Sequence, residues 1–433
     1  MLKEAKNIFM VGIGGIGLSG LARILRSQRK TVAGSDIEES EITKQLEDEG
    51  IMVSIGHSSG NLSNGIDLIV YSRAVSATNP ERMRARELGI AELSYPEALG
   101  ELARGFDKVI AVTGTNGKTT TTAMIGTILE DAGEDPTVLV GSRVLAWNSN
   151  VRVGRGKYLV LEADEYRRAF LNYPSDVAVI TNIEPDHLDY YRDLDDVKDG
   201  FAGFVKNIKP IGVLIYNADN KNAAEVAEKF EGGRVSFKAG NLSFKLLAPG
   251  KFNQENAAAA AAACKALGDS KDKIASALEN FTGIWRRFEK VGRVQGTDVI
   301  SDYAHHPAGI KAVLDAAVEV YKDSKKILVV FQPHQHNRTK KLFKEFINAF
   351  CSSKVDNLII AEIFDVAGRE ETADQDISSG DLVLEIEKCR KLVTYAKDLD
   401  SCEKEIKEVI SDYSAVIIMG AGDIYKVANH LVE

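Results

Sequence analysis

The chain has 433 residues, which is too long for one hydrophobic core and predicts about two to four domains. Its composition, 44% hydrophobic and 27% charged, is typical of a folded globular protein and excludes a disordered or fibrous one. A net charge of −9 argues against a nucleic-acid partner, because surfaces that bind a nucleic-acid backbone are normally basic. The first residues hold only a short apolar run, so we expect no signal peptide, no membrane span and a cytoplasmic protein.

Short apolar runs alternate with helical patterns along the whole chain, in three successive series. The runs of the first series are at 8–11, 31–33 and 68–71, those of the second at 109–112, 158–161, 177–181 and 212–216, and those of the third at 299–301, 327–331, 358–361 and 415–419. This strand–helix rhythm predicts an α/β fold with parallel sheets in three domains, which we place at 1–104, 105–284 and 285–433. The alanine-rich stretch 257–263 predicts a packed helix.

The four cysteines are far apart in the sequence and include no Cys-x-x-Cys pair. This spacing predicts neither a disulfide framework nor a zinc site. We expect buried or idle thiols, since cysteine often occupies a core position.

Residues 113–120, Thr-Gly-Thr-Asn-Gly-Lys-Thr-Thr, directly follow an apolar run and precede a helical pattern at 121–129. Glycines let backbone N–H groups approach phosphate oxygens, and the N-terminus of the following helix adds a favourable dipole. Lys118 supplies a positive charge and Thr119 can ligate magnesium. This shortened P-loop predicts an ATP site formed by Gly114, Thr115, Asn116, Gly117, Lys118, Thr119 and Thr120.

A second glycine pattern, Gly-Ile-Gly-Gly-Ile-Gly at 12–17, follows the first apolar run, and Asp36 follows the next one. The pattern fits G-x-G-x-x-G and leaves three interpretations open: a dinucleotide cofactor, another nucleotide, or a structural turn. Combined with the ATP site, a separate diphosphate site favours a ligase that acts on a nucleotide-carried substrate. A dehydrogenase would have no use for the P-loop.

Acids and a histidine follow the apolar runs of the second series. Glu162-Ala163-Asp164-Glu165 begins where the run 158–161 ends, and Asp186-His187 follows the run 177–181. The carboxyl ends of parallel strands meet at one edge of a sheet, so these side chains should lie beside the P-loop. We predict that Glu162 and His187 ligate a second magnesium ion, while a capping acid and a merely hydrogen-bonded histidine are the alternatives.

Four later segments carry amides, arginines and histidines: Phe-Asn-Gln-Glu-Asn at 252–256, Arg-Arg-Phe-Glu at 286–289, Asp-Tyr-Ala-His-His-Pro at 302–307 and Gln-Pro-His-Gln-His-Asn-Arg-Thr at 332–339. The last two each end an apolar run, where ligands bind in open α/β sheets. Arginine suits carboxylates and phosphates, but each segment alone fits a plain loop equally well. His57 and His430 lie outside these segments and are predicted at the surface.

Taken in order and with this spacing, the motifs resemble the Mur ligase family over essentially the whole chain. The segments that carry the resemblance are 12–20, 113–121, 162–165, 181–187, 286–288, 303–307, 331–334 and 420–424. The His-His-Pro and Gln-Pro-His segments are similar to the alanine-adding member in particular. The resemblance implies a Rossmann-like N-terminal domain for a UDP-sugar, a central P-loop ATPase domain, and a Rossmann-like C-terminal domain that closes over ATP and binds an amino acid.

The resemblance also implies the reaction and the site residues. ATP and Mg²⁺ are the implied cofactors, and the lactyl carboxylate of UDP-N-acetylmuramate is joined to L-alanine through an acyl phosphate, by a monomer or weak homodimer. The implied catalytic residues are Lys118, His187, His306 and Arg338, and the metal ligands are Thr119, Glu162 and His187. Further ATP contacts are implied for Asn253, Asn256, Arg287 and Asp302, and UDP-sugar contacts for Gly12, Gly14, Gly15, Ile16, Gly17, Asp36 and Ser72.

The chain departs from the family pattern in three places. Phe252 stands where histidine is usual, Tyr166-Arg167-Arg168 replaces the usual Ser-Asp, and Gln335 occupies a position that is often arginine. Alternative functions are a sibling ligase that adds a peptide or serves another wall polymer, a nicotinamide-dependent oxidoreductase, and a regulatory P-loop ATPase.

Overall fold

The structure is a computed structural model that describes residues 1–188, 190–240, 246–322, 326–365, 376–390 and 392–433. It divides into two compact units, of which unit 1 comprises Met1–Leu247 with Gln254–Phe281 and unit 2 comprises Ala248–Asn253 with Thr282–Glu433. Unit 1 contains two sheets and unit 2 contains one, so the predicted three-domain α/β fold is confirmed. The exact domain boundaries stay a prediction.

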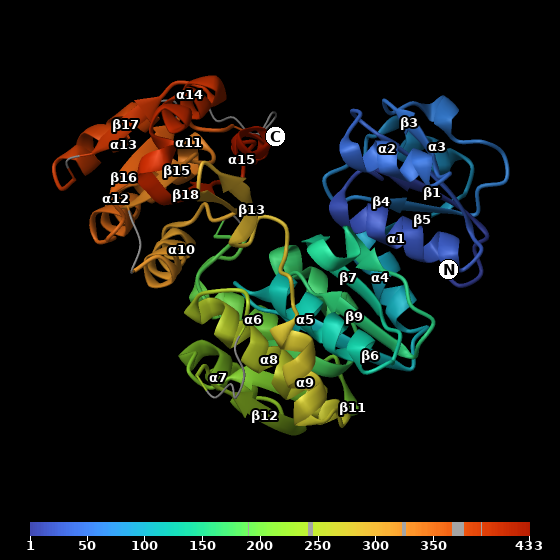
Figure 1. The fold of residues 1–433 in the computed structure, drawn as a ribbon. Helices are drawn as coiled ribbons and strands as arrows, with labels where there is room; N and C mark the ends of the chain where they lie inside the picture. The colour runs from blue at the N-terminus through green and yellow to red at the C-terminus, as the bar shows by residue number, and fades with distance from the viewer. Residues whose placement is uncertain (189, 241–245, 323–325, 366–375, 391) are drawn as a thin grey trace. The chain divides into compact units, whose positions relative to one another are not determined.

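The first sheet has five parallel strands in the order β3-β2-β1-β4-β5. Its strands are β1 (Asn7–Val11), β2 (Thr31–Asp36), β3 (Met52–Ile55), β4 (Leu68–Tyr71) and β5 (Ala91–Ser94). The helices around it in Figure 1 are α1 (Ile16–Ser27), α2 (Glu41–Asp48), α3 (Pro80–Glu87) and α4 (Tyr95–Ala103). The strand order reverses between β1 and β4, and ligands bind at such a point, outside the carboxyl ends of the strands.

The second sheet has seven strands in the order β12-β11-β10-β6-β9-β7-β8. Its strands are β6 (Lys108–Thr113), β7 (Thr137–Val144), β8 (Ser149–Arg152), β9 (Tyr158–Glu162), β10 (Ser175–Ile180), β11 (Ile208–Asn217) and β12 (Gly233–Phe237). Its helices are α5 (Lys118–Asp131), α6 (Leu194–Val205), α7 (Lys221–Glu228), α8 (Lys251–Leu267) and α9 (Lys271–Glu279). All pairs are parallel except β7 with β8, an antiparallel pair that the sequence did not predict.

One large hydrophobic cluster extends across both sheets of unit 1, and a smaller cluster with Phe9, Val11, Ile69 and Ala85 belongs to the first sheet. Helix α1 of the first sheet contacts β7 and β8 of the second, and Asn150 donates a 2.6 Å hydrogen bond to the carbonyl of Ile16. The predicted alanine-rich helix is confirmed as part of α8, with Ala257, Ala259, Ala260 and Ala263 fully buried. Both nucleotide-binding patterns therefore lie in one packed body.

The sheet of unit 2 has six strands in the order β13-β14-β18-β15-β16-β17. Its strands are β13 (Glu289–Val294), β14 (Thr297–Asp302), β15 (Lys326–Phe331), β16 (Asn357–Ala361), β17 (Val393–Ala396) and β18 (Tyr413–Met419). Its helices are α10 (Pro307–Val320), α11 (His336–Lys341), α12 (Phe343–Cys351), α13 (Ser379–Glu387), α14 (Leu399–Val409) and α15 (Tyr425–Val432). Strand β13 pairs antiparallel with β14, and the other pairs are parallel.

The prediction of four unpaired cysteines is wrong for two of them. Cys351, the last residue of α12, forms a disulfide with Cys389, which follows α13, at a Cα–Cα distance of 5.8 Å. The two residues are 38 positions apart, so only the packing of α12 against α13 brings them together. Cys264 and Cys402 are free and buried, as predicted.

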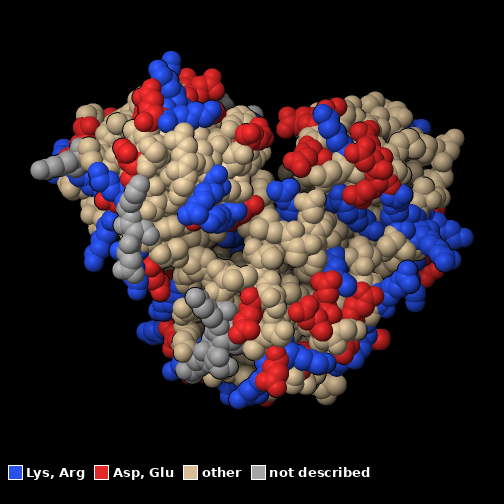
Figure 2. All heavy atoms as spheres, viewed as in Figure 1, with Lys and Arg blue, Asp and Glu red and all other residues tan. Residues whose placement is uncertain are grey.

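Charged side chains are mixed over the face of the protein that Figure 2 shows, where Lys and Arg alternate with Asp and Glu. Among the described residues, no helix is both long and apolar enough to cross a bilayer.

Candidate active site

The P-loop links β6 to α5, as the sequence predicted, and its glycines are required by the geometry. Gly114 has φ +138° and Gly117 has φ +84°, conformations that side chains other than glycine rarely adopt. A Cβ atom on Gly114 would lie 2.0 Å from Oγ1 of Thr181, and one on Gly117 would lie 2.2 Å from Oδ1 of Asn256. The loop therefore lies tightly against β10 and α8.

Asn182, which the sequence analysis did not single out as a site residue, fastens the P-loop. Its carbonyl accepts a 3.0 Å hydrogen bond from the N–H of Thr115, and its side-chain oxygen accepts a 2.9 Å bond from the N–H of Asn116. Its amide also donates to the carbonyl of Asn116 at 3.0 Å. These contacts fix the loop between the carboxyl ends of two neighbouring strands.

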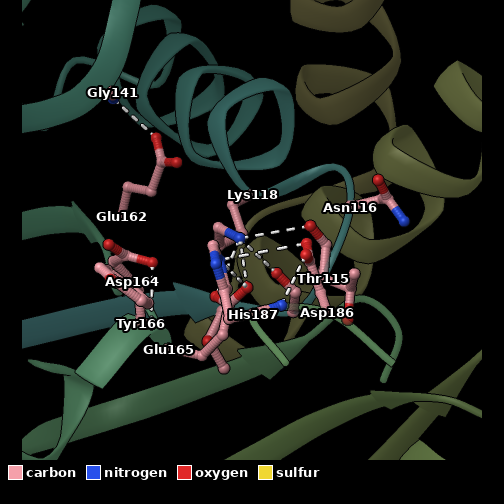
Figure 3. Close-up of polar contacts among 12 residues, drawn as sticks. Thr115, Asn116, Lys118, Gly141, Glu162, Asp164, Glu165, Tyr166, Asp186 and His187 are labelled. Atoms are coloured by element: carbon pink, nitrogen blue, oxygen red, sulfur yellow. Dashed lines mark hydrogen bonds and ion pairs between the residues drawn. The ribbon is translucent and has the colours of Figure 1, made fainter. Parts of the chain in front are cut away.

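Lys118 begins α5 and lies in a buried ion pair (Figure 3). Its Nζ donates to the carbonyl of Gly114 at 2.7 Å and to Oε1 of Glu165 at 2.9 Å, and lies 2.8 Å from Oε2 of Glu165. Burial by itself lowers the pKa of Lys118, but the carboxylates of Glu165, Asp164 and Glu162 outweigh it and the net pKa is raised. Lys118 is therefore a fixed positive charge at the first residue of α5.

Glu162 ends β9 and faces away from Lys118 in Figure 3. Its Oε2 accepts a 2.6 Å hydrogen bond from the N–H of Gly141, and its Oε1 accepts a 3.0 Å bond from Oγ1 of Thr119. Two of the three predicted metal ligands, Thr119 and Glu162, are therefore in contact with each other.

His187, the third predicted ligand, lies with other acids. Its Nε2 is 3.8 Å from Oε1 of Glu165, and its ring lies 4.7 Å from the ring of Tyr166. One ligand atom from each of Asp164, Glu165 and His187 lies within 4.8 Å of the others, a spacing that could hold a cation. The sequence analysis quoted Glu165 and Asp164 as part of a motif but did not assign them, although the acid-rich run after β9 was a usable signal.

The second glycine pattern lies at the carboxyl end of β1, as predicted. Ser72 follows β4 and donates its N–H to the carbonyl of Val11 at 2.9 Å, which places it next to the loop. Asp36 ends β2 and accepts the N–H of Gly14 at 2.7 Å and the N–H of Ile37 at 2.8 Å. One carboxylate oxygen of Asp36 thus holds the glycine loop, and the other accepts the N–H of the next residue. The predicted contact of Asp36 with uracil stays a prediction.

The remaining predicted ATP contacts are divided between the two units. Asn256 lies in unit 1, with Oδ1 3.4 Å from Oγ1 of Thr121 and close to Gly117, so it is part of the P-loop surroundings. Asn253 lies in unit 2, where its amide donates to the carbonyl of Pro249 at 2.7 Å. Phe252, next to Asn253, packs against the hydrophobic core of unit 2.

In unit 2, Asp302 ends β14 and is almost fully buried. Its two oxygens accept the N–H groups of Phe288 and Ala304, both at 2.7 Å, and burial raises its pKa. The guanidinium of Arg287 lies 5.3 Å from the ring of Tyr303. Asp302 therefore organises the loop that carries Arg287, and the predicted ribose contact stays a prediction.

A histidine cluster lies at the carboxyl ends of β14 and β15. The rings of His305 and His334 are 5.8 Å apart, and Nη1 of Arg338 lies 3.2 Å from Nδ1 of His334. Burial and the nearby Arg338 lower the pKa of His305 to about 3, so this ring is neutral. His306 directly precedes α10. The structure thus brings Arg338, a predicted catalytic residue, to the histidine segments.

His57 was predicted at the surface. Its Nδ1 instead lies 2.9 Å from Oε2 of Glu81, which is buried.

The fold and the site are those of a multidomain α/β enzyme with a P-loop for ATP and a second glycine-rich loop in the same unit. Three family descriptions match successive parts of the chain. "Mur ligase family, catalytic domain" matches residues 7–107, "Mur ligase middle domain" matches residues 112–237, and "Mur ligase, glutamate ligase domain" matches residues 286–422. The chain belongs to the Mur ligase family, and its predicted membership is confirmed.

Full-length relatives agree with this assignment. The UDP-N-acetylmuramate–L-alanine ligase of Caldanaerobacter subterraneus subsp. tengcongensis is 38% identical, over 100% of this chain and 98% of the relative. The enzyme of the same name from Clostridium novyi is 38% identical, over 99% of this chain and 97% of the relative. The crystal structure of UDP-N-acetylmuramate-alanine ligase from Thermotoga maritima matches with a TM-score of 0.83 at 29% identity, over 99% of this chain and 98% of that one.

Proposed function

We propose that this protein is an ATP-dependent ligase that joins L-alanine to the lactyl carboxylate of UDP-N-acetylmuramate, in the synthesis of peptidoglycan precursors. The observation that carries the proposal is the full-length match, at 38% identity, to enzymes named for this reaction. The two nucleotide loops of unit 1 support it, because the reaction needs one site for ATP and another for a nucleotide sugar.

The reaction transfers the γ-phosphoryl group of ATP to the carboxylate and releases ADP. The amine of alanine then attacks the acyl carbon, and inorganic phosphate leaves as the amide forms. Little covalent chemistry falls to the protein, which must bring two anions together. Lys118 supplies a fixed positive charge for the phosphates, and the N-terminus of α5, directly after the P-loop, adds a favourable dipole.

Magnesium is the cation that the acidic residues of this site fit, since carboxylate and hydroxyl oxygens are its preferred ligands. Thr119 and Glu162 are the residues that would hold one ion, and His187 with Asp164 or Glu165 the residues that would hold another. Bound magnesium would offset the negative charge of the phosphates. Within unit 2, we assign Arg338 and His306 to the amino acid or the reacting carboxylate, and Arg287 to the phosphates of ATP.

Phosphate release provides the test. The purified protein is incubated with ATP, Mg²⁺ and UDP-N-acetylmuramate, together with alanine, serine, glycine or a wall tripeptide in separate reactions. We expect release that depends on both alanine and the UDP-sugar, and none from Lys118→Ala. Release with the tripeptide only would instead favour the sibling ligase, and release without any amino acid would favour a plain ATPase. Size-exclusion chromatography tests the expected monomer or weak homodimer, and fractionation tests the expected cytoplasmic location.

A further inference from the structure

Two exposed arginines of unit 1 connect the glycine loop of the first sheet with the acidic loop of the second. Arg73 follows Ser72 at the carboxyl end of β4, and its Nη1 donates to the backbone carbonyl of Arg167 at 3.1 Å. Arg167 comes two residues after Glu165, the partner of Lys118. One hydrogen bond therefore joins the surroundings of the two nucleotide loops.

Neither of these two guanidinium groups forms an ion pair with a carboxylate among the residues that the structure describes. The neighbouring Arg168 differs, because its guanidinium lies 2.7 Å from Oδ1 of Asp196. Arg167 instead lies 5.3 Å from the ring of Tyr166, which in turn contacts His187. Two positive charges without an acid partner, in a protein of net charge −9, are suited to an anionic ligand.

The backbone holds Arg167 in an unusual conformation. Its φ and ψ are 49° and 31°, and those of Arg168 are 56° and 32°, so both residues are left-handed. Such angles are uncommon outside glycine and are found at functional sites more often than elsewhere. The N–H of Arg168 donates to the carbonyl of Glu165 at 2.9 Å, and Arg73 occupies the carbonyl of Arg167. These contacts fix the direction in which the Arg167 side chain leaves the loop.

We propose that Arg73 and Arg167 form an anion-binding pair that positions the acceptor carboxylate of the nucleotide-linked substrate next to the ATP site. The diphosphate already has the N-terminus of α1, which directly follows Gly15 of the glycine loop. Arg73 is directed to the loop that carries Glu165, where the carboxylate has to meet the phosphoryl group. The acids of that loop would repel a carboxylate, and two arginines offset this repulsion. The inference rests on the proposed function, because it concerns the carboxylate of that substrate.

Binding of three ligands to the full-length protein tests this pair, and calorimetry measures it. UDP presents only the diphosphate, UDP-N-acetylglucosamine adds the sugar, and UDP-N-acetylmuramate adds the carboxylate. We expect Arg73→Ala and Arg167→Ala each to weaken the binding of UDP-N-acetylmuramate by about ten-fold, which is the usual effect of losing one charged hydrogen bond. The other two ligands should bind within about two-fold of wild type. Lysine at either position keeps the charge and should restore part of the affinity.

Arg155→Ala is the matched control, because Arg155 is also exposed in unit 1 but follows β8. It should bind all three ligands like wild type. Equal losses for UDP-N-acetylglucosamine and UDP-N-acetylmuramate would assign the arginines to the diphosphate and overturn the proposal, as would no loss at all. Wild type that binds none of the ligands, or shows no alanine-dependent phosphate release, would mark failure of the proposed function instead.

Discussion

A Glu165→Gln substitution removes the carboxylate opposite Lys118 and preserves the volume of the side chain. The side chains of Lys118 and Glu165 are 15% and 2% exposed, so the remaining ammonium would stay largely desolvated. Breaking a buried pair by removing one charge typically costs about 3 to 5 kcal/mol. Lys118 keeps its hydrogen bonds to the carbonyls of Gly114 and Thr115, and the side-chain oxygen of the glutamine can still accept a hydrogen bond from its Nζ. We therefore expect the free energy of unfolding to fall by about 3 kcal/mol, the lower end of that range.

Calorimetry of the full chain without nucleotide measures this loss. For units of this size, a change of 1 kcal/mol moves Tm by about 2 to 4 °C, so we expect Tm to fall by about 6 to 12 °C. Lys118→Met and the double variant complete a double-mutant cycle. The double variant buries no unpaired charge, so the coupling between the two residues should be about 2 kcal/mol or more.

The pH dependence of Lys118→Met gives an independent check on the same pair. This variant leaves Glu165 without its cation, and burial raises the pKa of Glu165 in the folded protein. A group whose pKa is higher in the folded protein than in the unfolded chain holds its proton more tightly when folded. Its contribution to stability is complete at a pH below the unfolded pKa, and it is lost as the pH rises through the folded pKa. The variant should therefore lose stability relative to wild type as pH rises above the ordinary pKa of a glutamate side chain, about 4.3. A coupling near zero, or a Glu165→Gln variant that melts within about 2 °C of wild type, would refute the reasoning.

Three further predictions concern the two loops and the metal ligands. Gly117→Ala should abolish ATP binding in calorimetry, because the added Cβ would lie 2.2 Å from Oδ1 of Asn256. The control is Gly133→Ala, which has a similar φ of +83° but open space around it and should bind ATP normally. Asp36→Ala should weaken the binding of UDP-N-acetylmuramate by about ten-fold or more. It should leave kcat unchanged, because the residue orders a loop remote from the reacting carboxylate. Tight binding of NADH would contradict this assignment. His187→Ala should raise the magnesium concentration needed for half-maximal phosphate release, and an unchanged requirement would leave His187 a purely structural residue.

Elements whose signals are local could be predicted from the sequence. Strand β6, the P-loop and α5 were predicted from an apolar run, two glycines and Lys-Thr, because each feature depends on neighbouring residues only. The central strands were found for the same reason, since they are continuous apolar runs buried on both faces. The short strands β3, β5, β12 and β17 were not predicted, because they are partly exposed at or near sheet edges and carry no such run.

Only the tertiary structure decided which side chains meet. The sequence placed Glu162 with His187, yet Glu162 contacts Thr119 and Gly141, and Glu165 is the acid beside both His187 and Lys118. The chain turns directly after β9, so a difference of three residues changes which acid contacts Lys118, and no local pattern records that turn. The contact of Arg73 with the carbonyl of Arg167 spans 94 residues and depends on how two separate sheets pack. The same is true of the disulfide between α12 and α13, because long-range packing sets its geometry and sequence spacing does not.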